Sequence, residues 1–174
     1  LLPEINFVCG KSELSEIVDR TIKKYGPTTT STVLDNIKSM GFKYSTKASI
    51  SISVSDVMIP ENKSALIKKA EEDVEEIRQH FLMGELTEEE RYNMVIAIWN
   101  ATTKEIENAL DYSFDRYNPI KMMADSKARG SKTQMRQLAG IRGLMYSATG
   151  RTMEIPIKAN FREGLNILEY FIAA

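Results

Sequence analysis

The sequence predicts a mainly α-helical protein built on a long antiparallel helical hairpin, with short helices and a small β element beside it. Residues 61–117 contain no proline and a single glycine, Gly84. Apolar residues in this stretch recur every three or four positions, which is the period of an amphipathic helix. With 43% hydrophobic residues in a chain of 174, there is enough apolar material to bury a core. Only "ASISISVS" shows the two-residue alternation of a half-buried strand.

Two short helices are expected ahead of the hairpin. The first covers residues 12–25, where the apolar side chains share one face and Gly26-Pro27 follows as a stop. The second covers residues 31–40, with Gly41 as its left-handed cap. The strand is then predicted where the alternating apolar residues of "ASISISVS" would form its buried face; they are Ala48, Ile50, Ile52 and Val54.

The hairpin itself is predicted to turn at "MGEL" and to restart at a T-x-x-E capping box, Thr87 and Glu90. Its inward stripes are Leu66, Ala70, Val74, Ile77 and Phe81 on the first arm, and Val95, Trp99, Thr102, Ile106, Leu110 and Phe114 on the second. Such a hairpin serves either as a structural brace or as a docking handle whose tip reaches another protein.

The remainder is less regular. Asn118-Pro119 ends the second arm, because the residue before proline avoids the helical region. Residues 133–138 have room for a turn or two of helix, and "TMEIPI" is predicted as a short strand. A final helix is expected from Phe161, opened by Asn160 and Glu163, and with no terminator before Ala174 it is expected to continue in a longer polypeptide.

The charges are distributed unevenly, although the chain carries a net charge of only −1. Residues 61–117 hold fourteen acids and seven bases, whereas residues 118–145 hold six bases and one acid. The six are Lys121, Lys127, Arg129, Lys132, Arg136 and Arg142. Arg129 lies beside Gly130, and an arginine fork next to a flexible backbone suits phosphate oxygens. A solvated basic loop is the alternative, but the methionines and other apolar residues of this stretch favour a packed one.

The sequence lacks the motifs of a self-contained catalyst. It has no phosphate-binding glycine loop, no dinucleotide fingerprint and no HExxH. Its single cysteine, Cys9, and single histidine, His80, provide neither a zinc site nor a nucleophile with its base. No metal or cofactor is therefore expected in this chain, and a reducing, cytoplasmic setting is expected.

Several blocks nevertheless resemble one family. "NPIKMMADSKARGSKTQMRQLAGIRGLM" and "PIKANFREGLNILEYFI", preceded by "MGFKYSTKASISI", "VMIPENK" and "ERYNMVIAIW", are similar to the β′ subunit of bacterial DNA-directed RNA polymerase. The resemblance implies four segments. Residues 1–60 would be a small helical region with a strand, 61–117 the rim helices of the secondary channel, 118–159 a basic loop region with the F-loop, and 160–174 the start of the bridge helix.

The same resemblance implies roles for individual residues. Arg129 matches the arginine that faces the triphosphate of the incoming nucleotide, and Arg91, Tyr92 and Asn93 lie at a rim tip where channel factors dock. Bridge-helix support would come from Gln134, Arg136, Phe161 and Phe171. The sequence departs from the family pattern at Met94 and Ala97, where relatives carry lysine and aspartate, and at Lys127, where they carry glycine.

The resemblance also implies what lies elsewhere. The magnesium-binding aspartates and zinc-binding cysteines of the family are expected outside this chain, which would be inactive alone and active as part of a nucleotidyltransferase. Its implied partners are the β, α, ω and σ subunits, template DNA and RNA, the incoming nucleotide and transcript-cleavage factors, and no membrane. Two alternatives from the residues are a free-standing hairpin adaptor and a small nucleotide-binding module using Arg129.

Overall fold

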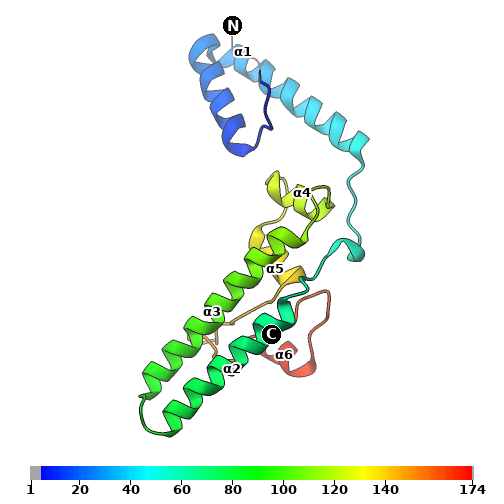
Figure 1. Cartoon of the computed structure of the whole chain (residues 1–174). Coiled ribbons are helices and arrows are strands. Elements are labelled where there is room, and N and C mark those ends of the chain that lie inside the picture. Colours follow the sequence, from blue (N-terminus) through cyan, green and yellow to red (C-terminus); the bar gives the residue numbers. More distant parts are fainter. Residues whose placement is uncertain (1–4, 174) are drawn as a thin grey trace.

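A computed structural model describes residues 5–173 and confirms a mainly helical protein. Leu1–Glu4 and Ala174, which belong to the first and last predicted segments, lie outside the described residues. The elongated molecule carries helix α1 at one end and the tip of a helical hairpin at the other (Figure 1). Within residues 5–173, no helix combines the length and the apolar character that crossing a membrane requires.

Helices α2 (Lys63–Leu82) and α3 (Glu88–Ser113) form the predicted antiparallel hairpin (Figure 1). The capping box is present, since the Thr87 hydroxyl accepts a hydrogen bond from the Glu90 amide and the Glu90 carboxylate accepts one from the Thr87 amide. All six inward residues predicted on the second arm are buried. On the first arm only Ala70 and Ile77 are buried, and the other three are half-buried.

Helix α1 (Lys11–Ala48) consists of two helical segments on either side of Gly26, in line with the two helices that the sequence predicts. The expected break survives as a kink, because Gly26 adopts φ 75° ahead of Pro27. The predicted stop at Gly41 is wrong. The backbone stays helical to Ala48, and Ser49 takes the left-handed cap conformation, with its amide donating to the Ser45 carbonyl.

The strand predicted at residues 48–54 is also wrong. Ala48 ends α1, and a short 3₁₀-helix, Val54–Asp56, follows an irregular linker. Ile50 and Ile52 are exposed, so the alternation has no buried face. The physical reason is that no neighbouring strand is available among residues 5–173, while the Ser53 side chain and the Asp56 carboxylate form a capping box instead.

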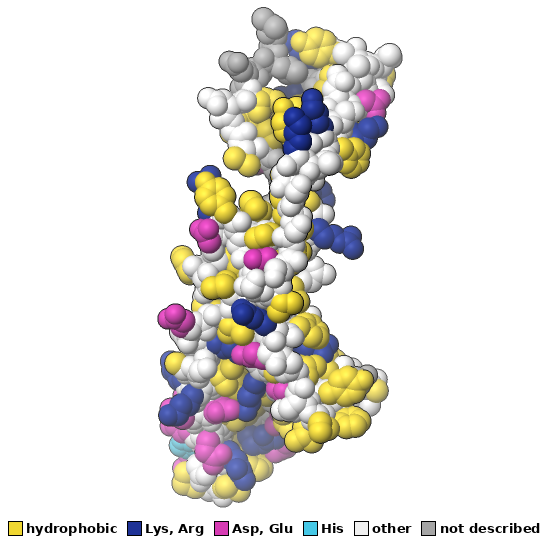
Figure 2. Space-filling view, turned by 90° about the vertical axis from the view of Figure 1, so that its right-hand side faces the viewer, with side chains coloured by type: hydrophobic (Ala, Val, Ile, Leu, Met, Phe, Trp, Pro, Cys, Tyr) yellow, Lys and Arg dark blue, Asp and Glu magenta, His cyan; other side chains and the backbone are white. Residues whose placement is uncertain are grey.

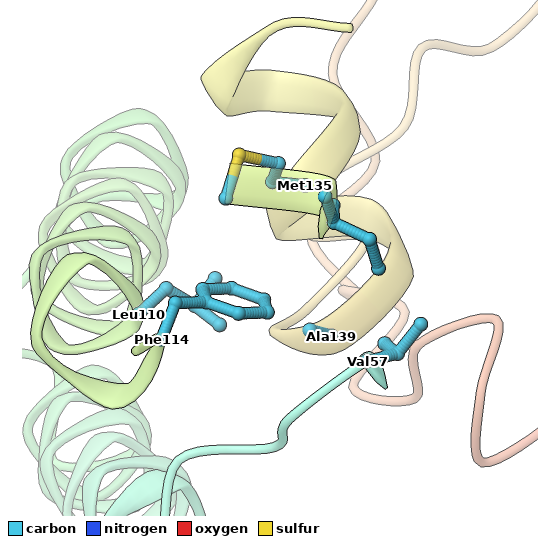
Figure 3. Close-up of a cluster of buried hydrophobic side chains, with 6 residues drawn as sticks. Val57, Leu110, Phe114, Met135 and Ala139 are labelled. Atoms are coloured by element: carbon cyan, nitrogen blue, oxygen red, sulfur yellow. The ribbon is translucent and has the colours of Figure 1, made fainter. Parts of the chain in front are cut away.

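Two short helices pack beside the far end of α3. Helix α4 (Pro119–Asp125) is capped by the Asn118 side chain, and α5 (Lys132–Ala139) by Ser131, as a short helix was predicted there. Figure 3 shows the cluster that joins them to α3 and to the linker after α1. Its buried members are Val57, Leu110, Phe114, Ile120, Met135 and Ala139.

The chain after α5 forms a loose two-stranded ribbon, residues 143–157, in place of the predicted strand. It has only two isolated antiparallel bridges, Gly143 with Ile157 and Tyr146 with Thr152. Beyond it, Asn160 and Glu163 exchange the expected capping bonds, but they close a single turn. Gly164 at φ 85° interrupts the helix, and α6 (Ile167–Ala173) begins later, at a second pair of reciprocal bonds.

Gly140 marks the closest approach of this region to α3. A Cβ at Gly140 would lie 2.9 Å from Leu110 Cδ1 and 3.0 Å from both Ile106 Cγ2 and the Arg136 carbonyl oxygen. Gly41 lies inside α1, and a Cβ there would meet nothing within 4 Å. The two glycines therefore provide a matched pair for substitution.

We expect Gly140→Ala to lower the free energy of unfolding by about 1–3 kcal/mol, because α5 and α3 would have to separate. Gly41→Ala should instead raise it by about 0.4–1 kcal/mol, because alanine is the better helix former. Urea unfolding followed by circular dichroism measures both. Equal effects of the two substitutions would contradict the close packing at Gly140.

Candidate functional site

Four of the six cations in residues 118–145 bind other parts of the chain. Lys121 Nζ donates to the carbonyl oxygens of Asp111 and Phe114, at 2.8 and 3.3 Å, and so caps the end of α3. Lys132 Nζ lies 2.5 Å from the Asp111 carboxylate, and this hydrogen bond raises the pKa of Lys132. Both lysines fasten α4 and α5 to α3.

The two arginines that follow are also engaged. Arg136 Nη1 donates to the carbonyl oxygens of Ile141 and Arg142, at 3.3 and 3.0 Å, and thereby holds the turn after α5. The Arg142 guanidinium carbon lies 5.1 Å from the centre of the Phe161 ring. Arg136 and Arg142 therefore stabilise the local fold.

Lys127 and Arg129 are different, because neither side chain forms an ion pair, a hydrogen bond or an aromatic contact with residues 5–173. Arg142 also lacks a side-chain hydrogen bond, and its Nε is buried without a partner, but its guanidinium lies over the Phe161 ring. They lie on the exposed turn between α4 and α5. Lys127 adopts φ 56°, a left-handed conformation that favours glycine, and Gly130 adopts φ 91°. The turn is tied to α4 by the Arg129 amide, which donates to the Met123 carbonyl. Its backbone thus presents an unpaired guanidinium at a fixed place.

Arg129 stands at a cavity of about 280 Å³ between α4, α5 and the segment after the ribbon. Side chains of Ile120, Met123, Met135 and Leu138 form apolar walls, and Gln134 and Gln137 add amide groups. An apolar cavity with a few polar groups is typical of a ligand site. Arg129 would favour an anionic group on whatever enters.

The predicted support residues divide into two groups. Gln134 and Phe161 line the cavity together with Arg129, although they come from α5 and from the segment before α6. Arg136 faces the turn after α5, and Phe171 is exposed on α6, in contact with the Tyr170 ring. The sequence reading missed Ile52 and Gln137, which also line the cavity. Of these two residues, only Gln137 could have been predicted from the sequence, because it lies one helical turn after Gln134 and so shares its face of the helix.

At the hairpin tip, Arg91 and Tyr92 are held by the ribbon, whereas Asn93 is exposed. Arg91 lies 2.5 Å from a Glu88 carboxylate oxygen and 2.6 Å from one of Glu154. Hydrogen bonds to Glu88 and then to Glu154 raise the pKa of Arg91, and the bond from Arg91 lowers the pKa of Glu88. Arg91 therefore forms ion pairs that stabilise the fold, in addition to lying at the tip of the hairpin.

The surface near the tip mixes acidic, basic and apolar side chains (Figure 2). Leu82 and Met83 are exposed at the turn, where His80 Nδ1 lies 2.5 Å from a Glu85 carboxylate oxygen. This hydrogen bond raises the pKa of His80 above its ordinary value of 6.5, and the charge of Glu76 contributes. Among residues 5–173, no three His, Cys, Asp or Glu side chains are grouped to hold a metal ion.

Comparison with known proteins gives two family matches. Residues 6–57 match the model described as RNA polymerase Rpb1, domain 3, and residues 86–162 match RNA polymerase Rpb1, domain 4. The DNA-directed RNA polymerase subunit beta′ of Thermoanaerobacter pseudethanolicus is 55% identical over 170 residues, which is 98% of this chain and 14% of that protein.

Beta′ subunits of other bacteria are similar to this chain to about the same degree. The beta′ subunits of Acetivibrio thermocellus and Clostridium acetobutylicum are each 51% identical, over 98% and 99% of this chain, respectively. The chain spans only 14–15% of the length of these relatives. The two family matches together cover both α1 and the region of the Arg129 cavity.

The His80–Glu85 pair predicts a pH dependence at the hairpin turn. Because the folded-state pKa of His80 is raised, the pair contributes fully below pH 6.5 and its contribution fades as the pH rises through the raised pKa. We expect nuclear magnetic resonance of the single histidine to give a pKa above 6.5. Glu85→Gln should move the pKa down toward 6.5, and an unshifted wild-type titration would contradict the pairing.

Proposed function

The chain belongs to the family of RNA polymerase large subunits, as a segment of a bacterial β′ subunit, and on this premise we propose that it forms part of the channel through which nucleotides reach the active centre. In this role it supports DNA-templated RNA synthesis by the assembled nucleotidyltransferase. The unpaired Arg129 at the mouth of an apolar cavity is the observation that carries the proposal.

Arg129 is the group that contacts the nucleotide triphosphate. Of the six cations in its stretch, it and Lys127 alone have no ion pair, hydrogen bond or aromatic contact among residues 5–173, so its charge is available to a ligand. A guanidinium fork pairs with two phosphate oxygens at once. The left-handed Lys127 and Gly130 fix the turn that presents it. Lys127 adds a second cation to the same turn.

Helix α5 and Phe161 form the support for the bridge helix, which would begin with α6. Phe161 and Arg162 donate backbone hydrogen bonds to the carbonyl oxygens of Gln137 and Leu138. The Glu169 carboxylate of α6 accepts from the amides of Lys158 and Ala159, at 3.0 and 3.1 Å. The start of α6 is therefore tied to the wall of the cavity. Gln134 contributes through its place in that wall, and Arg136 through the turn after α5.

The hairpin tip is the docking site for channel-binding proteins such as transcript-cleavage factors. Its exposed groups are Asn93, Met94 and the turn residues Leu82 and Met83. Tyr92 and Arg91 contribute from the side that faces the ribbon. The family pattern that the sequence resembles has charged residues where this chain has Met94 and Ala97, so a factor that uses those charges would bind this chain less tightly.

The remaining parts of the polymerase provide what this chain lacks. The β, α, ω and σ subunits, template DNA and RNA are the partners of the assembled cytoplasmic enzyme. Magnesium and zinc are held by other parts of the subunit, since the sequence has neither the triple-aspartate motif nor a cysteine cluster. Magnesium would supply the activation of the attacking 3′ oxygen, and Arg129 would hold the phosphates in line.

In the assembled polymerase, Arg129→Ala should raise the KM for nucleotide, or lower kcat/KM, by about tenfold to a hundredfold. Loss of one charge-assisted contact of about 1.5–3 kcal/mol is the reason. Arg129→Lys should fall between, because it keeps the charge and loses the fork. Rapid-quench measurement of single-nucleotide addition provides both constants.

Arg116→Ala is the matched control, since Arg116 is exposed on the turn after α3 and stacks only on Tyr117. Its kinetics should equal those of the wild type. Wild-type kinetics for Arg129→Ala as well would remove Arg129 from the nucleotide site.

Docking at the tip makes a separate prediction. Asn93→Ala should weaken the binding of a transcript-cleavage factor by about 0.5–1.5 kcal/mol, the value of one hydrogen bond. Met94→Lys should strengthen the binding of a factor taken from a lysine-bearing relative by about 0.2–1 kcal/mol. Fluorescence anisotropy with labelled factor measures both. Asn100→Ala, exposed two turns further along α3, is the control, and an effect as large as that of Asn93→Ala would contradict tip docking.

A further inference from the structure

Three contacts fasten the ribbon to the hairpin tip, and we call them the clamp. Arg91 binds both oxygens of Glu154, at 2.6 and 3.0 Å. The Tyr92 hydroxyl donates to the Thr152 carbonyl at 3.0 Å. The Arg151 guanidinium lies over the Tyr92 ring, 4.3 Å from its centre. The two ends of the clamp are about sixty residues apart in sequence.

Apart from the clamp, few contacts stabilise the outer half of the ribbon, which lies around its turn at residues 146–155. A two-stranded ribbon is marginally stable by itself, and this one has two isolated bridges. Tyr146 and Ile155 are 75% and 62% exposed, so the outer half buries few apolar groups. Leu144 packs against the Trp99 cluster at the inner end of the ribbon, so the clamp is the main attachment of the end near the tip.

The inner end of the ribbon leads to the Arg129 cavity. Gly143 and Ile157 exchange backbone hydrogen bonds of 3.0 and 2.9 Å, and the Arg142 amide donates to the Ala159 carbonyl at 3.2 Å. The next residue, Asn160, donates to the carbonyls that end α5. The residue after that, Phe161, is bonded to Gln137, and both line the cavity. The two bridges of the ribbon, the covalent chain between them and these hydrogen bonds thus link the tip to the cavity wall.

We propose that the clamp couples the hairpin tip to the Arg129 cavity, with Glu154 and Tyr92 as positioning residues that set the ribbon for nucleotide addition. This inference rests on the proposed function in taking the tip and the cavity as its two working parts. A displacement of the ribbon reaches the cavity through backbone bonds and needs no contact between the partner and the nucleotide.

The charge of the tip indicates which partner engages the clamp. Residues 71–90 contain nine acids and one arginine, which favours a partner with a cationic docking face. Glu88 is the accessible member, with 61% of its side chain exposed, whereas Glu154 has 30%. A partner cation that takes Glu88 leaves Arg91 to Glu154 alone. Docking then tightens the clamp and fixes the ribbon more firmly.

Hydrogen–deuterium exchange on the assembled polymerase tests this coupling with opposite substitutions. Glu154→Gln should speed exchange in peptides from residues 144–155 by about tenfold, because it removes the charge that holds Arg91. Glu88→Gln should slow exchange in the same peptides, since it leaves Arg91 to Glu154, and exchange as fast as that of Glu154→Gln would contradict the proposal. Glu89→Gln, an exposed acid on the same turn of α3, should match the wild type.

The cavity provides the second readout. Glu154→Gln should raise the nucleotide KM several-fold, although Glu154 does not line the cavity, and Arg91→Lys should act in the same direction. Wild-type exchange in residues 144–155 of Glu154→Gln, or faster exchange with an unchanged KM, would overturn the coupling. The proposed function is tested separately. Wild-type kinetics of Arg129→Ala would refute the role of the cavity, and unchanged factor binding by Asn93→Ala would refute the role of the tip.

Discussion

The buried side-chain amide of Asn160 connects the end of α5 to the segment before α6 and, through Glu163, to the start of α2. Its Nδ2 donates to the carbonyl oxygens of Ala139 and Gly140, at 2.9 and 3.1 Å, and its Oδ1 accepts from the Glu163 amide at 2.8 Å. Glu163 in turn pairs with Lys63, which is only 5% exposed at the start of α2. A buried lysine is tolerated only because it is paired. Without Asn160, the carbonyls that end α5 would be buried unsatisfied, each at a cost of about 1–3 kcal/mol.

Much of the fold was predictable, because local chemistry determines most of its elements. The helical period of the apolar residues in 88–114 and the capping box at Thr87 together predicted α3. The predicted strand failed because a pattern does not reveal its neighbours. Alternation in "ASISISVS" predicts a strand, but no strand lies beside it in the described part of the chain. The sequence offers two N-x-x-E starts near α6, and only the positive φ of Gly164 decides between them.

The candidate site was predictable in its chemistry and less so in its shape. An arginine next to a glycine in a basic stretch singles out Arg129, and Gln134 and Phe161 followed from the family resemblance. Ile52 was missed because it belongs to a linker more than sixty residues away from the rest of the cavity. Likewise, the pairing of Arg91 with Glu154 joins segments that no local pattern relates. Contacts between distant segments are the part that a sequence period does not encode.

The cations show how the fold separates structure from function. A cluster of positive charges must be paired or solvated. Here some of the cations are paired with oxygen atoms of the chain, and Lys127 and Arg129 are left to solvent. Lys121 binds carbonyl oxygens at the C-terminal end of α3, where the helix dipole favours a cation. Lys132 binds the Asp111 carboxylate, and Arg136 binds carbonyl oxygens in the turn after α5. On the exposed turn between α4 and α5, Arg129 forms no ion pair with an acid of the described chain. The fold thus uses some cations of this stretch in its own contacts and leaves Arg129 without an ion pair beside the cavity, which is the arrangement that the proposed phosphate contact requires.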